Sequence, residues 1–104
     1  MKTIQDEATF SNIVNNDETS IIKFYTNWCP DCRRMDMFID EIIETHSNFG
    51  WFQLNKDEIP EIAAKHEVMG IPSLLVFKNG EKIGHLHSAN AKSPEEVLDF
   101  LKSF

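Results

Sequence analysis

A chain of 104 residues, 41% of them hydrophobic and 26% charged, has the size and composition of one globular domain with a single modest core, spanning residues 1–104. Ten basic and seventeen acidic side chains give a net charge of -7, which repels nucleic acid and anionic lipid. These numbers exclude a second domain and a polyanion-binding role.

Hydrophobic periodicity predicts strands alternating with helices in the first half of the chain. The apolar start "KTIQ" is typical of a short strand, and Asp6 can cap a helix whose apolar face includes Phe10 and Val14. "SIIKFYT" has the β-branched and aromatic character of a strand. Apolar residues then recur at intervals of three and four from Met35 to Ile43, which predicts one long helix.

The second half continues the alternation and adds a hairpin. "WFQLN" predicts a strand, and Asp57 can cap a short helix that carries Ile59 and Ile62. "IPSLLVFKNGEKIGHLH" predicts two strands joined by an Asn-Gly turn. Ser93 as N-cap and Pro94 at the first helical position predict a last helix. The order β-α-β-α-β-α-β-β-α indicates an α/β fold with a mixed sheet covered by helices on both faces.

Both cysteines of the chain lie in the short stretch "YTNWCPDC". The first ten residues contain no apolar run, and the run "LLVF" is far too short to span a bilayer, so we expect a soluble, cytoplasmic protein without a membrane partner. We also expect a monomer. Thiols are kept reduced in the cytoplasm. The close pair Cys29 and Cys32 is therefore interpreted as catalytic, redox-sensing or metal-binding rather than as a structural crosslink.

The cysteine pair falls at the junction of a central strand and the start of a helix. A thiolate at Cys29 would be stabilised by the free N–H groups and the positive dipole end of that helix. Pro30 suits the first helical position, and Cys32 then lies in the first turn, close enough for a reversible disulfide. Closing so short a loop stabilises the fold by only about 2 kcal/mol, so stability alone does not explain the spacing.

The stretches "FYTNWCPDC" and, some forty residues later, "MGIPSLLVFKNGE" resemble the two signatures of the thioredoxin family, in the right order. The resemblance covers nearly the whole chain and implies the thioredoxin fold. It also implies a thiol–disulfide oxidoreductase that reduces protein disulfides or mixed disulfides with small thiols and needs no bound cofactor beyond its Cys29–Cys32 disulfide. Its electrons would come from a flavin- and NADPH-dependent reductase or from a small thiol.

The resemblance also assigns roles to single residues. Cys29 would attack the substrate disulfide, and the less exposed Cys32 would resolve the mixed disulfide. Pro72 would be a cis-proline that turns the backbone of Ile71 toward the sulfurs to pair with a substrate strand. Trp28 would shield the disulfide and offer apolar docking surface. The alternatives are an ordinary strand-entry proline and a tryptophan that only packs.

Lys23 stands where most thioredoxins carry a buried aspartate that moves a proton at the resolving cysteine, and Gln53 stands where they carry the neighbouring lysine. One hypothesis is that Lys23 tunes the sulfurs, as a cation that favours thiolate or as a desolvated base. The other is that its stem packs on the sheet while its ammonium reaches water or a helix carboxylate such as Glu41 or Glu44.

Asp31, between the cysteines, is a second tuning candidate. Its carboxylate suits the helix dipole but repels a thiolate at Cys29. Arg33 and Arg34 attract the same thiolate, although Arg33 can also pair with Asp36 on the helix surface.

Three further departures bear on direction and partners. Proline directly after the first cysteine resembles glutaredoxins and some disulfide oxidants, so the direction of catalysis stays open. Met37 takes the place of the family's kinking proline. Ser88 stands where a glycine usually lines the substrate groove, which predicts a narrower or more polar groove.

Two alternative functions stay open at this stage. Cys29 and Cys32 could bind zinc together with His85 and His87, which alternate on one face of a strand, although that strand is predicted to be a solvent-facing edge. The fold could also serve as a non-catalytic interaction module whose disulfide is only a redox sensor. The full set of cysteines, tryptophan and proline favours the enzyme.

Overall fold

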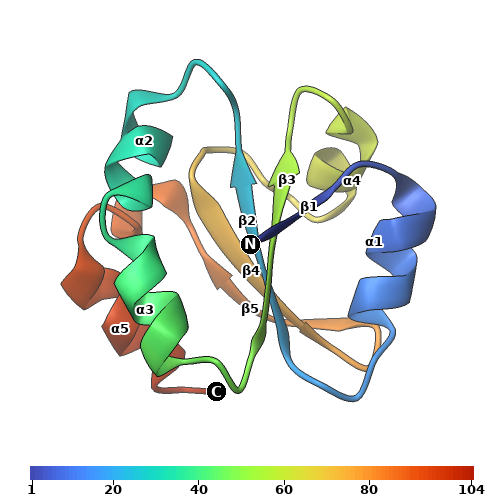
Figure 1. The fold of residues 1–104 in the computed structure, drawn as a ribbon. Helices are drawn as coiled ribbons and strands as arrows, with labels where there is room; N and C mark the ends of the chain where they lie inside the picture. Colours follow the sequence, from blue (N-terminus) through green and yellow to red (C-terminus); the bar gives the residue numbers. More distant parts are fainter.

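The computed structural model describes residues 1–104 as a five-stranded sheet between two layers of helices (Figure 1). The strands are β1 (Lys2–Ile4), β2 (Ser20–Tyr25), β3 (Gly50–Asn55), β4 (Ser73–Lys78) and β5 (Glu81–Leu86). The helices are α1 (Glu7–Val14), α2 (Pro30–Asp36), α3 (Ile39–Thr45), α4 (Pro60–Lys65), the 3₁₀ turn η1 (Ser88–Asn90) and α5 (Pro94–Leu101). None of the helices has the length and apolar character needed to cross a membrane.

The sheet has the strand order β1-β3-β2-β4-β5 and is mixed. β1 and β2 both run parallel to β3, whereas β4 runs antiparallel to β2 and to β5. β2 is therefore the central strand, paired on both sides along its length. The predicted α/β class and mixed sheet are confirmed.

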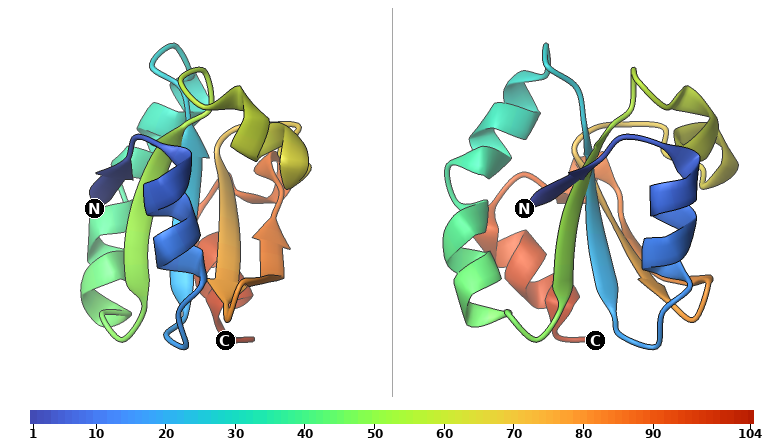
Figure 2. Two further views of the ribbon diagram at one scale, coloured as in Figure 1. Left: turned by 90° about the vertical axis from the view of Figure 1, so that its right-hand side faces the viewer. Right: turned by 45° about the vertical axis from the view of Figure 1, so that its right-hand side comes forward.

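Helices cover both faces of the sheet, with α1 and α4 on one side and α2, α3 and α5 on the other (Figures 1 and 2). β2 and β4 contribute side chains to both resulting cores, which explains why their sequences are continuous apolar runs rather than alternating ones. The core under α1 and α4 includes Phe10, Phe24, Leu54, Leu75 and Phe77. The core under α2, α3 and α5 includes Ile21, Met35, Ile39, Leu74 and Val97.

Local signals for caps and turns are largely confirmed. The Asp6 carboxylate accepts a hydrogen bond of 2.7 Å from the backbone N–H of Thr9 and caps α1. The Ser93 hydroxyl accepts one of 3.3 Å from the backbone N–H of Glu96, with Pro94 at the first helical position of α5. Asn79 and Gly80 have φ angles of 53° and 79°, the left-handed conformation that a tight hairpin turn requires.

The prediction of one long helix after the cysteines is wrong, because the segment forms two helices, α2 and α3. The N–H groups of Met37 and Phe38 donate to the carbonyls three residues back, which tightens the chain and ends α2. The side chain of Met37 is exposed at this break, whereas that of Ile39 is buried. The apolar spacing runs through the break unchanged, so periodicity alone does not reveal it.

Asp57 does not cap the helix that follows it. α4 begins at Pro60 with Ile59 as N-cap and has no side-chain cap. The carboxylate of Asp57 instead accepts a hydrogen bond from the indole of Trp28, 29 residues earlier. A contact between two loops has replaced the predicted local one.

Candidate redox site

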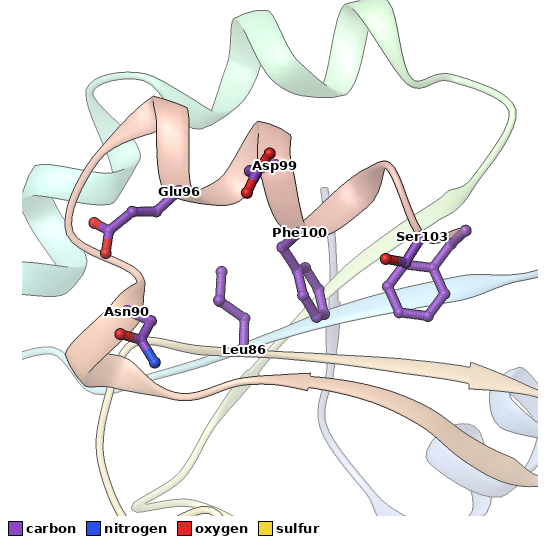
Figure 3. Close-up of a pocket in the computed structure, with 7 residues that line it drawn as sticks. Leu86, Asn90, Glu96, Asp99, Phe100 and Ser103 are labelled. Carbon is purple, nitrogen blue, oxygen red and sulfur yellow. The ribbon is translucent and has the colours of Figure 1, made fainter.

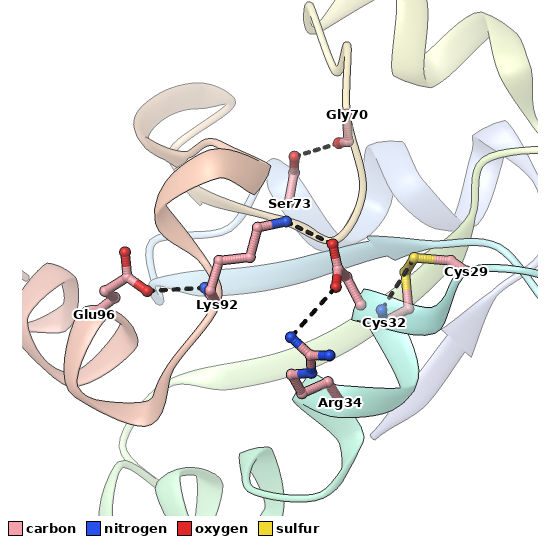
Figure 4. A network of polar contacts seen from close by, with 8 residues as sticks. Cys29, Cys32, Arg34, Gly70, Ser73, Lys92 and Glu96 are labelled. Atoms are coloured by element: carbon pink, nitrogen blue, oxygen red, sulfur yellow. Dashed lines mark hydrogen bonds and ion pairs between the residues drawn. A yellow bond between two sulfur atoms is a disulfide. The ribbon is translucent and has the colours of Figure 1, made fainter.

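The two cysteines lie where the central strand gives way to a helix. β2 ends at Tyr25, Cys29 is the N-cap of α2, and Pro30 takes the first helical position. The sulfur of Cys29 accepts the backbone N–H of Cys32 at 3.0 Å, and a disulfide joins the two residues, whose Cα atoms are 5.2 Å apart (Figure 4). A sulfur that already accepts a helix N–H occupies the site where a thiolate is stabilised.

The two sulfur-bearing residues differ little in exposure. Cys29 is 3% exposed and Cys32 is 2% exposed, so both are buried in this disulfide form. The prediction that Cys29 is the more accessible of the two therefore gains no support from burial. Its assignment as nucleophile depends on its N-cap position.

Trp28 precedes the disulfide and points its ring outward. It is 67% exposed, which disagrees with the alternative of a tryptophan that only packs. Its Nε1–H donates to Asp57 at 2.8 Å and so joins the loop after β2 to the loop after β3. The ring is thus held in place while its apolar face is free, and docking of substrate on it stays a prediction.

The segment before β4 contains the cis peptide bond predicted between Ile71 and Pro72. The buried hydroxyl of Ser73 donates to the carbonyl of Gly70 at 2.6 Å and closes this turn. A Cβ at Gly70 would collide with the hydroxyl of Ser88. Ser88 therefore packs directly on the turn, and the pairing of a substrate with Ile71 stays a prediction.

Lys23 is buried, with 2% of its surface exposed, and its ammonium forms an ion pair with the Asp36 carboxylate of α2. The predicted partners Glu41 and Glu44 are exposed instead. The ammonium thus reaches a helix carboxylate, Asp36 in place of Glu41 or Glu44, and the tuning of the sulfurs by Lys23 stays a prediction. Asp36 was missed as a site residue because the prediction paired its carboxylate with Arg33 on the helix surface, whereas that carboxylate pairs with Lys23.

Other polar groups on β2 and β3 lie near this pair. The ammonium of Lys23 is 5.4 Å from the centre of the Tyr25 ring. Burial, with smaller contributions from the charges of Glu58 and Asp36, raises the pKa of Tyr25. Gln53 is the register partner of Lys23 on β3, but its amide donates to the Thr3 hydroxyl at 2.9 Å.

Asp31 is exposed and paired with cations. Its carboxylate accepts a hydrogen bond of 2.6 Å from Lys92, and Arg34 lies at 3.8 Å (Figure 4). The hydrogen bond and charge of Lys92, and to a lesser extent Arg34, hold the pKa of Asp31 below its ordinary value. Arg33 donates to the carbonyl of Asn27 at 3.0 Å, so its predicted pairing with Asp36 is wrong.

His85 of β5 and His87, which follows the end of that strand, do not join the cysteines in a metal site. The rings of His85 and His87 stack at 3.7 Å, and Lys82 lies 3.1 Å from Nδ1 of His85. Burial, with the charges of His87 and Lys82, lowers the pKa of His85 to about 4. Nowhere in the chain do three or more histidine, cysteine or acidic side chains gather as metal ligands, so the zinc alternative has no support.

A hollow of about 490 Å³ lies between α5 and the end of β5 (Figure 3). Its lining includes Leu86, Phe100 and the carboxylates of Glu96 and Asp99. No residue that the sequence predicts for the site lines it. It is separate from the disulfide.

A redox disulfide at the N-terminus of the helix that follows the central strand of a mixed sheet defines a thiol–disulfide oxidoreductase. The family model described as Thioredoxin matches residues 1–103. The chain belongs to the thioredoxin family.

Individual relatives agree over nearly the full length. Thioredoxin-1 of Schizosaccharomyces pombe is 31% identical over 98 residues, which cover 94% of this chain and 95% of that protein. A thioredoxin of Porphyra purpurea is 32% identical, covering 89% of this chain and 88% of its own. The crystal structure of oxidised mitochondrial thioredoxin 3 from Saccharomyces cerevisiae has a TM-score of 0.88 at 24% identity, covers all of this chain and 95% of that one, and has the same fold.

Family membership and the Cys29–Cys32 pair make this protein a protein-disulfide reductase that works through a dithiol/disulfide cycle. Members of the family need no bound cofactor, because the disulfide itself carries the two electrons. They reduce disulfide substrates and receive electrons from a reductase.

Proposed function

We propose that this protein reduces disulfides of other proteins, or mixed disulfides with small thiols, with Cys29 as nucleophile and Cys32 as resolving thiol. The observation that carries the proposal is the position of Cys29 at the N-cap of α2, where its sulfur accepts the N–H of Cys32. The same N–H would stabilise the Cys29 thiolate in the reduced protein.

The cycle balances two electrons and two protons. The Cys29 thiolate attacks one sulfur of the substrate disulfide, and the other substrate sulfur leaves as a thiolate that takes a proton from solvent. Cys32 then loses its proton and attacks the sulfur of Cys29. The substrate's second sulfur leaves, and the Cys29–Cys32 disulfide forms again.

The substrate would dock on the surface that adjoins the disulfide. Trp28 offers an exposed ring held by Asp57. The backbone of Ile71, next to Pro72, would pair with an extended substrate strand. Ser88, packed on Gly70, would narrow this groove and make it more polar.

Electrons to regenerate the dithiol would come from a flavin- and NADPH-dependent reductase, in a reducing compartment such as the cytoplasm, and the protein would work as a monomer. The thioredoxin relatives favour this donor over a small thiol. NADPH consumption with a purified thioredoxin reductase, compared with regeneration by glutathione alone, distinguishes the two donors. Faster regeneration by glutathione would overturn this part of the proposal.

The test of the function is the reduction potential of the Cys29/Cys32 couple, titrated in defined thiol–disulfide buffers with Trp28 fluorescence as the signal. We expect a value below the cytosolic glutathione potential, together with reduction of insulin disulfides that the Cys29→Ser variant lacks. Since about 30 mV is a tenfold change in the equilibrium, the titration separates a reductase from an oxidant. A distinctly more oxidising potential would refute the reductase. A reduction potential below the glutathione potential without reduction of insulin would indicate a redox sensor.

A further inference from the structure

The ion pair of Lys23 and Asp36 has no part in the cycle described so far. Lys23 is a charged residue in the centre of the sheet, 2% exposed, whereas Asp36 is 55% exposed on its side chain. A buried cation is costly unless it is paired, and a surface carboxylate has no need of a buried partner. One end of this ion pair, the Lys23 ammonium, is therefore buried under α2, and the other end, the Asp36 carboxylate, reaches the solvent.

This pair lies under the same face of α2 as the resolving cysteine. Cys32 and Asp36 are four residues apart in α2, and residues at that spacing are neighbours on one face, with Cβ atoms about 5 to 6 Å apart. Cys32 is buried against the sheet at 2% exposure, and Asp36 reaches Lys23 on β2 from the same helix. The ammonium of Lys23 is therefore held against the carboxylate of Asp36, which lies one helical turn along α2 from Cys32.

We propose that Lys23 stabilises the thiolate of Cys32 when that cysteine resolves the mixed disulfide, and that Asp36 is the positioning residue that holds the Lys23 ammonium in place. The inference rests on the proposed role of Cys32 as resolving thiol. Cys32 loses a proton to solvent, its thiolate forms the bond to the Cys29 sulfur, and the substrate sulfur leaves with the electron pair of the broken bond.

The other charged or titratable groups around Lys23 do not take this role. Tyr25 faces the ammonium from the same strand at 5.4 Å, and its raised pKa keeps it neutral at physiological pH. Glu58 contributes to the pKa of Tyr25. Gln53 on β3 and Leu74 on β4, the register partners of Lys23, carry no charge. On α2 itself, Asp31 is held by Lys92 and Arg34, and Arg33 donates to the carbonyl of Asn27. Cys32 is the thiol that this helix carries.

The test measures the pKa of Cys32 alone. In the Cys29→Ser variant Cys32 is the only thiol, and its thiolate absorbs near 240 nm, so a pH titration gives its pKa directly. Adding Lys23→Met should leave about tenfold less thiolate at pH 7, a rise of about one pKa unit, because the stabilising cation is gone. Lys23→Arg should restore most of the thiolate. Lys65→Met and Asp40→Asn, exposed charges on α4 and α3, are the matched controls and should change nothing.

Asp36 is tested in the same background. If it holds the Lys23 ammonium in place, Asp36→Asn should itself raise the Cys32 pKa, since the ammonium of an unpaired buried lysine leaves the site for water. When Asp36→Asn is already present, Lys23→Met should then raise the Cys32 pKa by less than half of the rise that it causes alone. A Cys32 pKa that falls with Asp36→Asn, as simple loss of a negative charge predicts, would overturn the proposal, and so would an unchanged pKa with Lys23→Met.

Two controls keep the result interpretable. Circular dichroism and urea midpoints show whether each variant folds, and Asp36→Asn changes an exposed side chain, so it remains a valid test if Lys23→Met fails to fold. Insulin reduction by the unmodified protein is measured separately. Its absence would refute the proposed function, whereas the thiol titration needs no turnover and reports only on the pair.

Discussion

Replacing Trp28 with alanine isolates the contribution of one exposed ring to substrate docking. Tryptophan buries at most about 250 Å², and 67% of Trp28 is exposed in the free protein, so about 170 Å² is available to a partner. At about 25 cal/mol per Å², full coverage would contribute about 4 kcal/mol, and a substrate that covers half would gain about 2 kcal/mol. We therefore expect kcat/KM for insulin to fall about 30-fold.

The decisive assay compares two substrates. A small disulfide such as hydroxyethyl disulfide cannot cover the ring, so its reduction by the Trp28→Ala variant should change little. Trp28→Phe keeps most of the apolar area but loses the hydrogen bond to Asp57. Its kcat/KM for insulin should therefore lie between those of the unmodified protein and the Trp28→Ala variant. Leu98→Ala, which removes an exposed apolar side chain from α5, is the matched control. Equal losses for both substrates would refute docking on Trp28 and indicate an effect on the sulfurs.

Three more predictions concern the fold around the site. Gly70→Ala should lower kcat/KM for insulin, because the new Cβ collides with Ser88. Adding Ser88→Gly should restore kcat/KM, and a double variant whose loss equals the sum of the two single losses would refute the contact. Ser93→Ala removes the N-cap of α5 and should cost about 1 kcal/mol, seen as a fall in melting temperature of about 4 to 8 °C. The pKa of His85 is about 4 in the folded chain and about 6.5 when unfolded, so the unfolded state binds more protons between these values. The neutral His85 contributes about 1 to 2 kcal/mol to the free energy of unfolding after solvent screening. This contribution is present above pH 6.5 and is lost as the pH falls toward 4. The urea midpoint of the His85→Gln variant should therefore depend less on pH in this range.

The features that could be predicted from sequence are those that depend on near neighbours in the chain. Asn79 and Gly80 make a tight turn by their own conformational preferences, and Ser93 with Pro94 starts a helix with no help from tertiary contacts. The placement of Cys29 at a helix N-terminus follows from a strand pattern that leads into a proline. These local rules were enough to locate the disulfide.

The features that were missed depend on contacts between distant segments. Lys92 pairs with Asp31 across 61 residues, and no spacing rule connects them. The partner of Lys23 depends on which side chain of α2 faces the sheet, and that in turn depends on where α2 ends. Because the helix breaks after Asp36, the more distant Glu41 and Glu44 are on α3 and stay in solvent.

The break between α2 and α3 leaves α2 with only two buried side chains, Cys32 and Met35. One of its two anchors is therefore part of the bond that the reaction opens and closes. Reduction opens the covalent bond between Cys32 and the N-cap residue Cys29, while Met35 and the ion pair of Asp36 with Lys23 still attach α2 to the sheet. The stiffness of the first turn of this short helix therefore changes with the number of electrons the protein carries. A partner resting on α2 would sense the redox state as a mechanical difference, without touching either sulfur.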